Sequence, residues 1–116
     1  MRPADVPEIY LARIRAGDVR GLGALFAPDA LFQGPAGVLR GREAIERFYA
    51  GVFQAGSQQH QVGRTVVEGS RVVFELIPTD PPRPPHDSTI AIDLMEIDAA
   101  GLIEKFTVYL RPPPQA

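Results

Sequence analysis

Apolar residues recur at two different spacings along the 116-residue chain. In the first half they fall three and four residues apart, which is the spacing of one face of a helix. After residue 56 the period is closer to two, which is typical of strands that bury one face. The pattern predicts helices over residues 5–17, 18–26 and 41–53. It predicts strands over residues 30–33, 61–68, 71–76, 88–97 and 102–110, with a turn or bulge at 34–37.

Individual residues mark where the first two helices are expected to begin and end. Asp5 comes before a first-turn proline and Glu8 follows three residues later, which is the sequence of a capping box. Gly17 suits the end of the first helix, because glycine adopts the left-handed conformation without strain. Asp18 is placed to cap the second helix.

Prolines gather outside the predicted helices and strands. Eight of the twelve lie in residues 78–86 or in residues 111–116. Because proline has no N–H to donate within a sheet, residues 78–86 are expected to form a loop. Residues 111–116 are expected to form an exposed Pro-rich tail. A length of 116 residues suits one domain, so we expect a single domain over residues 1–116; the chain has no internal repeat.

Helices followed by strands that alternate in polarity predict an α+β fold. We expect three N-terminal helices packed on a strongly curved antiparallel or mixed β-sheet, in the shape of a cone. A cone that is closed on one side by a helix leaves space for a small ligand.

Composition narrows the range of partners. The net charge of −2, with basic residues scattered along the chain, argues against nucleic acid or an anionic membrane surface. There are no cysteines, and the two histidines, His60 and His86, have no carboxylate at a metal-ligand spacing, so no metal and no other cofactor is expected. No apolar run approaches the roughly 18 residues of a membrane span, and a cytoplasmic location is expected.

The candidate chemistry begins with Asp93, a carboxylate that lies among Ile, Leu and Met residues. Loss of solvation raises the pKa of such a carboxyl and favours its neutral form, which can donate a hydrogen bond. Tyr10, on the first predicted helix, carries a phenol that can donate a second one. A phenol beside a neutral carboxylic acid can bind an oxyanion, so these two residues predict a pocket with chemistry.

Several short motifs, taken in order, resemble the nuclear-transport-factor-2-like (NTF2-like) superfamily, and within it the SnoaL-like and ketosteroid-isomerase-like proteins. The likeness runs from Tyr10 to about Leu110. The residues that carry it lie at 10–18, 25–30, 34–37, 41–49, 92–95 and 101–103.

The resemblance implies roles for individual residues. Tyr10 matches the family's oxyanion-hole tyrosine and Asp93 its protonated aspartic acid, so both are expected to be catalytic. Tyr49 matches the tyrosine that hydrogen-bonds the first one. Phe26 stands where a third tyrosine would extend this network. The side chains expected to bind the substrate are those of Phe26, Gln33, Phe48, Tyr49, Phe53 and Met95.

One position departs from the isomerase. Its general base is an aspartate at the end of the first strand, before a proline, and here that position is Gly34. Because glycine cannot move a proton, we expect the two hydrogen-bond donors of the isomerase, Tyr10 and Asp93, to be present and its general base to be absent. His60 or Glu75 could replace the base if either points inward, although a position at a polar rim or on a solvated strand is favoured for both.

Related chemistries fit less well. Epoxide hydrolases of this superfamily use an Asp-Arg-Asp set, but Val73 and Val108 stand where the two aspartates would fall. Polyketide cyclases of the SnoaL type use an aspartate as acid and base, for which Asp93 is the one deep candidate.

Three functions remain open. The first is an isomerase or lyase that acts on a small hydrophobic carbonyl compound, with Tyr10 and Asp93 as donors. The second is a non-catalytic protein that binds such a molecule. The third is a dimerisation module, and a homodimer through the sheet is expected in any of these cases. The sheet residues named for this contact are Val66, Phe74, Phe106 and Val108.

Overall fold

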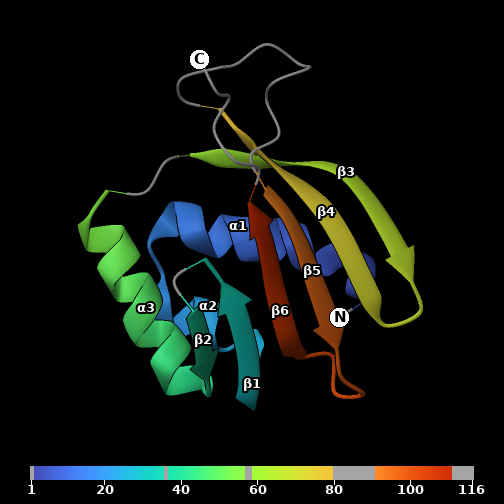
Figure 1. The fold of residues 1–116 in the computed structure, drawn as a ribbon, viewed down its shortest axis with the longest axis horizontal. Helices are drawn as coiled ribbons and strands as arrows, with labels where there is room; N and C mark the ends of the chain where they lie inside the picture. The colour runs from blue at the N-terminus through green and yellow to red at the C-terminus, as the bar shows by residue number, and fades with distance from the viewer. Residues whose placement is uncertain (1, 36, 57–58, 80–90, 111–116) are drawn as a thin grey trace.

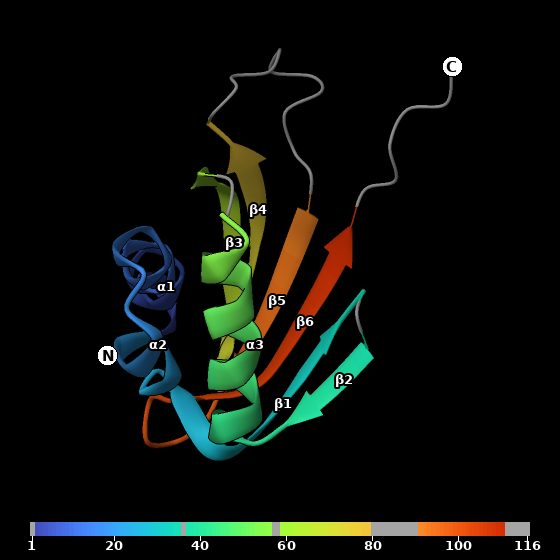
Figure 2. The same cartoon turned by 90° about the vertical axis from the view of Figure 1, so that its left-hand side faces the viewer.

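The computed structural model describes residues 2–35, 37–56, 59–79 and 91–110. Within them a six-stranded mixed sheet has three α-helices on one side (Figure 1). The turned view in Figure 2 shows the helices and the sheet as two layers. This arrangement confirms the predicted α+β class. The predicted tail, and most of the predicted proline-rich loop, lie outside the described residues.

The helical elements are η1 (Pro3–Asp5), a short 3-10 turn, followed by α1 (Val6–Ala16), α2 (Val19–Gly23) and α3 (Arg42–Gln54). The strands are β1 (Phe26–Gly34), β2 (Gly37–Arg40), β3 (His60–Glu68), β4 (Arg71–Pro78), β5 (Ala91–Ile97) and β6 (Ile103–Leu110). Their order in the sheet is β2-β1-β6-β5-β4-β3. The β1–β6 pair is parallel and the other neighbouring pairs are antiparallel.

The predicted helix ends are confirmed in part. Gly17 follows α1 in the left-handed conformation, with φ of 64°. The Oδ1 atom of Asp18 accepts a hydrogen bond of 2.9 Å from the backbone N–H of Gly21, which caps α2. The predicted capping box is wrong, because the Asp5 side chain makes no capping hydrogen bond. The turn η1 runs into α1, so the backbone of Asp5 is already helical and its side chain accepts from Arg2 instead.

Two segments have a different secondary structure from the one that the hydrophobic pattern predicted. The predicted second helix extended to Phe26, but α2 ends at Gly23 and Phe26 begins β1, where it pairs with Ile103 of β6. Two of the five residues of α2 are glycines, which are poor helix formers. Strand β2 was not predicted, since its four residues are too few to show a period; it forms a hairpin with β1.

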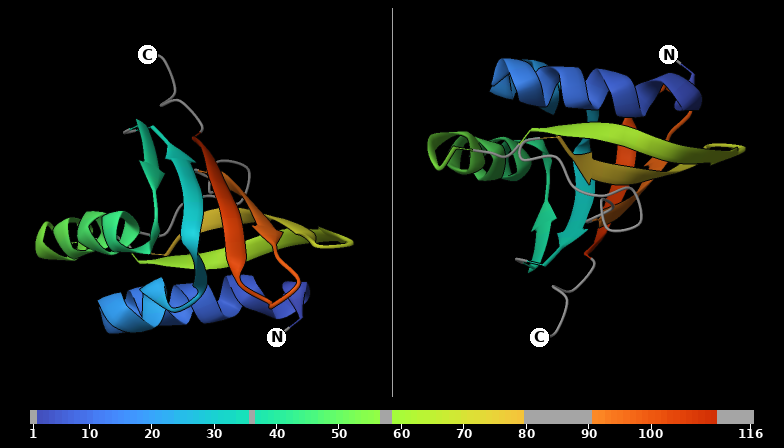
Figure 3. Two further views of the ribbon diagram at one scale, coloured as in Figure 1. Left: turned by 90° about the horizontal axis from the view of Figure 1, so that it is seen from below. Right: turned by 90° about the horizontal axis from the view of Figure 1, so that it is seen from above.

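Strand register decides which side chains face the helices. Asp93 of β5 pairs with Phe74 of β4 and with Val108 of β6, and paired residues point to the same face of a sheet. We call this the inner face; α1 runs along β3 and α3 lies against β1 to cover it (Figure 3). Chain neighbours of these residues point to the outer face. In β5, alternate residues beginning with Ala91 are accordingly buried, and those between them are half-buried.

Aromatic rings fill the space between the layers. Phe106 of β6 is fully buried, and its ring lies 5.2 Å from the ring of Tyr10, 5.2 Å from that of Phe32 and 6.1 Å from that of Phe26, measured between centroids. The ring of Phe106 on β6 therefore packs against residues of α1 and β1, which are distant from it in sequence.

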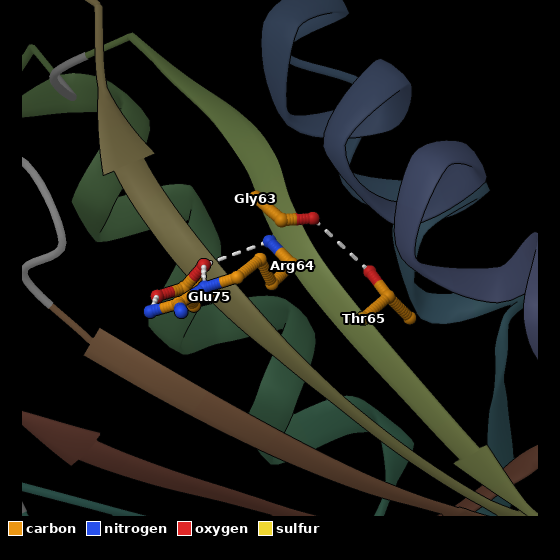
Figure 4. A network of polar contacts seen from close by, with 4 residues as sticks. All are labelled: Gly63, Arg64, Thr65 and Glu75. Atoms are coloured by element: carbon orange, nitrogen blue, oxygen red, sulfur yellow. Dashed lines mark hydrogen bonds and ion pairs between the residues drawn. The ribbon is translucent and has the colours of Figure 1, made fainter. Parts of the chain in front are cut away.

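A buried carboxylate on the outer face is fully satisfied. Glu75 of β4 accepts hydrogen bonds from the backbone N–H of Arg64 at 2.8 Å and from its guanidinium at 2.9 and 2.7 Å (Figure 4). The register of β3 shifts here, between Val62 and Thr65. Gly63 permits the approach, since a Cβ atom there would lie 3.0 Å from the Glu75 carboxylate and 2.6 Å from Ile77.

Apolar side chains are exposed on the outer face, among them Val66 at 66% and Tyr109 at 58% of their full areas. Val66 is one of the residues named from the sequence for a dimer contact. The assignment of the other three is wrong: Phe74 and Phe106 are buried in the core, and Val108 points to the inner face. The homodimer itself stays a prediction. Among the described residues, no helix is long and apolar enough to cross a membrane.

The central position of Phe106 gives a stability prediction. Phe106→Ala removes a buried ring from a site closed on several sides, and is expected to lower the free energy of unfolding by about 3–5 kcal/mol. Tyr109→Ala removes an exposed ring from the same strand and should change it by about 0.5 kcal/mol. Urea unfolding followed by circular dichroism measures both. Equal losses would contradict this assignment of faces.

Candidate functional site

A cavity of about 400 Å³ lies between the helices and the inner face of the sheet. Most of its wall is aromatic or aliphatic, and its polar groups come from four residues, Tyr10, Tyr49, His60 and Asp93. The complete set of lining residues is Tyr10, Phe32, Gly34, Pro35, Phe48, Tyr49, Val52, His60, Leu76, Ala91, Asp93, Val108 and Leu110.

Two phenols from different helices form a pair in this cavity. The hydroxyls of Tyr10 on α1 and Tyr49 on α3 are hydrogen-bonded to each other, and each side chain is 5% exposed. Burial is the main cause that raises the pKa of both phenols, so both stay protonated. The two hydroxyls have two protons and their mutual bond uses one. The other proton is available to a ligand.

Asp93 supplies the second polar group. It is 1% exposed, and its Oδ1 atom has no hydrogen-bond partner among the described residues. Burial raises the pKa of Asp93 to about 7. A neutral carboxylic acid at this position presents a donor and an acceptor to the cavity, whereas an ionised one is costly to bury.

The paired neighbours of Asp93 explain why its Oδ1 atom has no partner among the described residues. They are Phe74 on one side and Val108 on the other, and neither side chain can make a hydrogen bond. Because β5 has a hydrogen-bonded strand on each side, its backbone cannot turn the carboxyl toward solvent without breaking the sheet. The cavity is therefore the side from which a ligand group can reach Asp93.

Gly34 and His60 line the same cavity from opposite sides of Asp93. Gly34 is the last residue of β1, two strands from β5 in one direction, and His60 is the first residue of β3, two strands away in the other. The sequence favoured a rim or solvated position for His60, but its side chain forms part of the cavity wall. Its carbonyl accepts a 2.9 Å hydrogen bond from Arg15 of α1.

Glu75, the other candidate base, is not among the lining residues. The next residue, Leu76, lines the cavity, so by the alternation of the strand Glu75 points to the outer face. Its carboxylate is held there by Arg64. Glu75 has no route to a ligand in this cavity.

The structure brings together some of the residues expected to bind substrate. Phe48 and Tyr49 line the cavity. Phe26 and Met95 are fully buried in the core and do not line it, and Phe53 packs behind Tyr49 with a centroid distance of 6.2 Å. Gln33 points to the outer face, where its side-chain Oε1 atom accepts a 3.4 Å hydrogen bond from the hydroxyl of Thr107.

Several lining residues were not predicted, and the sheet register accounts for some of them. Ala91 lies two positions from Asp93 and Val108 pairs with it, so the register, had it been known, would have found these two. The lining residues that were not predicted are Phe32, Pro35, Val52, Leu76, Ala91, Val108 and Leu110. In the part of the chain that the structure describes, no three His, Asp or Glu side chains are grouped in a way that could hold a metal ion.

The chain is similar to known proteins in sequence. A family model described as a SnoaL-like domain matches residues 8–105. A protein named steroid Delta-isomerase, from Nocardioides simplex, is 30% identical over an alignment of 105 residues that covers 89% of this chain and 85% of that protein. The chain therefore belongs to the SnoaL-like family, and the resemblance found in its sequence is confirmed.

Solved structures show the same fold. An NTF2-like protein of unknown function from Cytophaga hutchinsonii has a TM-score of 0.74 at 17% identity, covering 97% of this chain and 92% of that one. A putative polyketide cyclase from Sinorhizobium meliloti has a TM-score of 0.74 at 21% identity, covering 94% of this chain and 100% of that one. At these identities the likeness concerns the fold alone.

The buried carboxyl predicts how stability depends on pH. The pKa of Asp93 is about 7 in the folded protein and near 3.8 when unfolded, so the folded state holds the extra proton between these values. The contribution of Asp93 to the free energy of unfolding is therefore largest at the acidic end. It falls by about 4 kcal/mol as pH rises from about 4 to about 7. Asp93→Asn cannot titrate and should lose this component.

The measurement is urea unfolding of the wild type and of Asp93→Asn at a series of pH values. The difference between the two curves isolates Asp93 from the other titrating groups. The variant should gain stability relative to the wild type as pH rises toward 7, and the difference should then level off. Parallel curves from pH 4 to pH 8 would show that Asp93 is not a buried acid.

Proposed function

We propose that this SnoaL-like protein binds a small hydrophobic carbonyl compound and acts on it as an isomerase or lyase of the ketosteroid isomerase type. Tyr10 and Asp93 donate hydrogen bonds to the oxygen of that compound. The observation that carries the proposal is the buried Oδ1 atom of Asp93, which has no partner among the described residues and lies in the same cavity as the phenol pair.

The chemistry follows from where charge develops. When a proton leaves the carbon next to a carbonyl, negative charge accumulates on the oxygen. Donors that are already in place in a cavity poor in water stabilise this charge far better than water does. A phenol with one free proton and a neutral carboxylic acid are two such donors.

The rest of the wall supports a flat, apolar ligand. Phe32 and Phe48 present aromatic rings, with centroids 5.4 Å apart, and Leu76 and Val108 present aliphatic groups. A volume of about 400 Å³ lies within the range of small-molecule sites. The name of the Nocardioides protein, steroid Delta-isomerase, supports a ligand with fused rings.

A non-catalytic binding protein is the second candidate, and Gly34 favours it. This residue stands at the position where the resemblance places the base of the isomerase, and it has no side chain. A protein with the two donors and no base holds a carbonyl or phenolate oxygen without moving a proton.

Binding of 2-naphthol, a fluorescent phenol with two fused rings, tests the donor pair. Tyr10→Phe and Asp93→Leu each remove one donor and put an apolar side chain of similar size in its place. Each is expected to weaken binding by about 3–10-fold, the usual loss for a hydrogen bond between neutral groups. Tyr109→Phe, which removes an exposed hydroxyl from the outer face, is the matched control and should bind as the wild type does.

The pH dependence of the same titration identifies the acid. Because Asp93 donates only while protonated, wild-type affinity should fall as pH rises through about 7. Asp93→Asn keeps an N–H donor that does not titrate, so its affinity should lose this step. No detectable binding of 2-naphthol by the wild type at any pH would reject the proposed function.

Restoring the base gives a gain-of-function prediction. Gly34 has a backbone that other residues can adopt, and a Cβ atom there would lie 3.1 Å from Cε1 of Phe32, which requires only a small shift of the ring. Gly34→Asp should raise the rate of isomerisation of a β,γ-unsaturated steroid ketone by about 100-fold or more. The absorbance of the conjugated product measures the rate.

Gly34→Ala is the control for this experiment, because it adds the same Cβ atom without a carboxylate. Its rate should stay near that of the wild type. If the Asp and Ala variants have the same rate, position 34 does not face the reacting carbon of the ligand.

A further inference from the structure

We propose that His60 is the general base of this site, taking a proton from the carbon next to the bound carbonyl group. The inference rests on the proposed function, since it needs an oxygen held by Tyr10 and Asp93. It differs from that function in naming a catalytic group on β3, on the side of the cavity away from Gly34.

The chemistry of the cavity wall leads to His60. Four of the described residues that line it have side chains that titrate: Tyr10, Tyr49, His60 and Asp93. The two phenols stay protonated and serve as donors, so neither accepts a proton from carbon. Asp93 must itself be protonated to bind the oxygen. An imidazole is the one remaining group that can accept a proton near neutral pH.

The backbone of His60 is fixed by the helix that carries Tyr10. Arg15 lies five residues after Tyr10 on α1, and its Nη2 atom donates a 2.9 Å hydrogen bond to the carbonyl of His60. On its other side, His60 pairs with Pro78 of β4. The base and one of the two donors are therefore positioned by the same helix, as a proton transfer between fixed groups requires.

The sheet register indicates how a ligand lies between the proposed donors and the proposed base. Leu76 pairs with Ala91 of β5 on one side and with Val62 of β3 on the other, so it lies on the inner face between the strands of Asp93 and His60. A ligand that fills the cavity has its oxygen at Tyr10 and Asp93, its rings against Leu76, and an edge toward His60.

The proposed step balances without any other reactant. A ring nitrogen of neutral His60 takes the proton, and the electrons of the broken C–H bond form a carbon–carbon double bond. The carbonyl π electrons move to the oxygen, which Tyr10 and Asp93 stabilise. The imidazolium then returns the proton to the same carbon, which gives exchange, or to a carbon further along a conjugated system, which gives isomerisation.

The test uses 2-tetralone, a bicyclic ketone whose enolate has the shape of the 2-naphthol anion. In D₂O, base catalysis replaces the hydrogens on the carbon next to its carbonyl by deuterium, and proton NMR follows the loss of their signals. The wild type should accelerate this exchange over buffer. His60→Gln should reduce the acceleration by about 100-fold or more, the usual contribution of a general base.

Binding of 2-naphthol is measured on the same samples and separates the two proposals. His60→Gln should bind it within about two-fold of the wild type, since the donors are intact, and this also reports that the cavity has folded. His60→Asn, which places its amide nearer the backbone, is the second variant if the first does not fold. Tyr109→Phe, on the outer face, controls for substitution alone and should exchange 2-tetralone as the wild type does.

Each outcome has one meaning. Loss of exchange with retained 2-naphthol binding supports His60 as the base. Exchange that persists in both His60 variants, or a wild type that binds 2-naphthol without accelerating exchange, overturns this inference and leaves the binding part of the proposed function standing. A wild type that binds no 2-naphthol rejects both.

Discussion

A buried carboxyl group, whose Oδ1 atom has no partner in the part of the chain that the structure describes, is the constraint on which the rest of this structure depends. Asp93 lies in β5, with a paired strand on each side, and the paired side chains next to it are apolar. The core accepts such a group in its neutral form, because the ionised form would lose its solvation and gain no hydrogen bond in return. The cavity is the space in which a ligand can provide the missing partner.

The phenol pair obeys the same constraint. A single buried phenol would also need a partner, and Tyr10 and Tyr49 provide one for each other across two helices. Their mutual bond satisfies one hydroxyl as donor and leaves the other hydroxyl with a free proton. Because burial raises the pKa of both phenols, neither of them ionises near neutral pH. The phenols can therefore act as donors at neutral pH, and Asp93 can do so at pH values below about 7.

The sequence predicted features that depend on local chemistry and missed those that depend on register. Gly17 and Asp18 mark helix ends through backbone geometry and a hydrogen bond between near neighbours, and both are confirmed. An inward-facing Asp93 followed from one carboxylate among apolar residues. The face of Gln33 did not, because a strand with apolar residues on both faces carries no sign of which face is covered. An error of one position moves a side chain to the opposite face.

The proposed donor and the proposed base place different demands on the sheet. The next residue along a strand faces the other side, so the choice of position matters more for the donor than for the base. A donor such as Asp93 must be buried, neutral and flanked by apolar neighbours, and few positions in a small sheet meet all three conditions. A base needs only access to the ligand and a pKa near the working pH. Gly34, at the end of β1, and His60, at the start of β3, lie at opposite sides of the same cavity, and either position has that access. In the proposed function, a glycine at position 34 therefore leaves Tyr10 and Asp93 in place as donors, and His60 supplies the proton acceptor from the other side of the cavity.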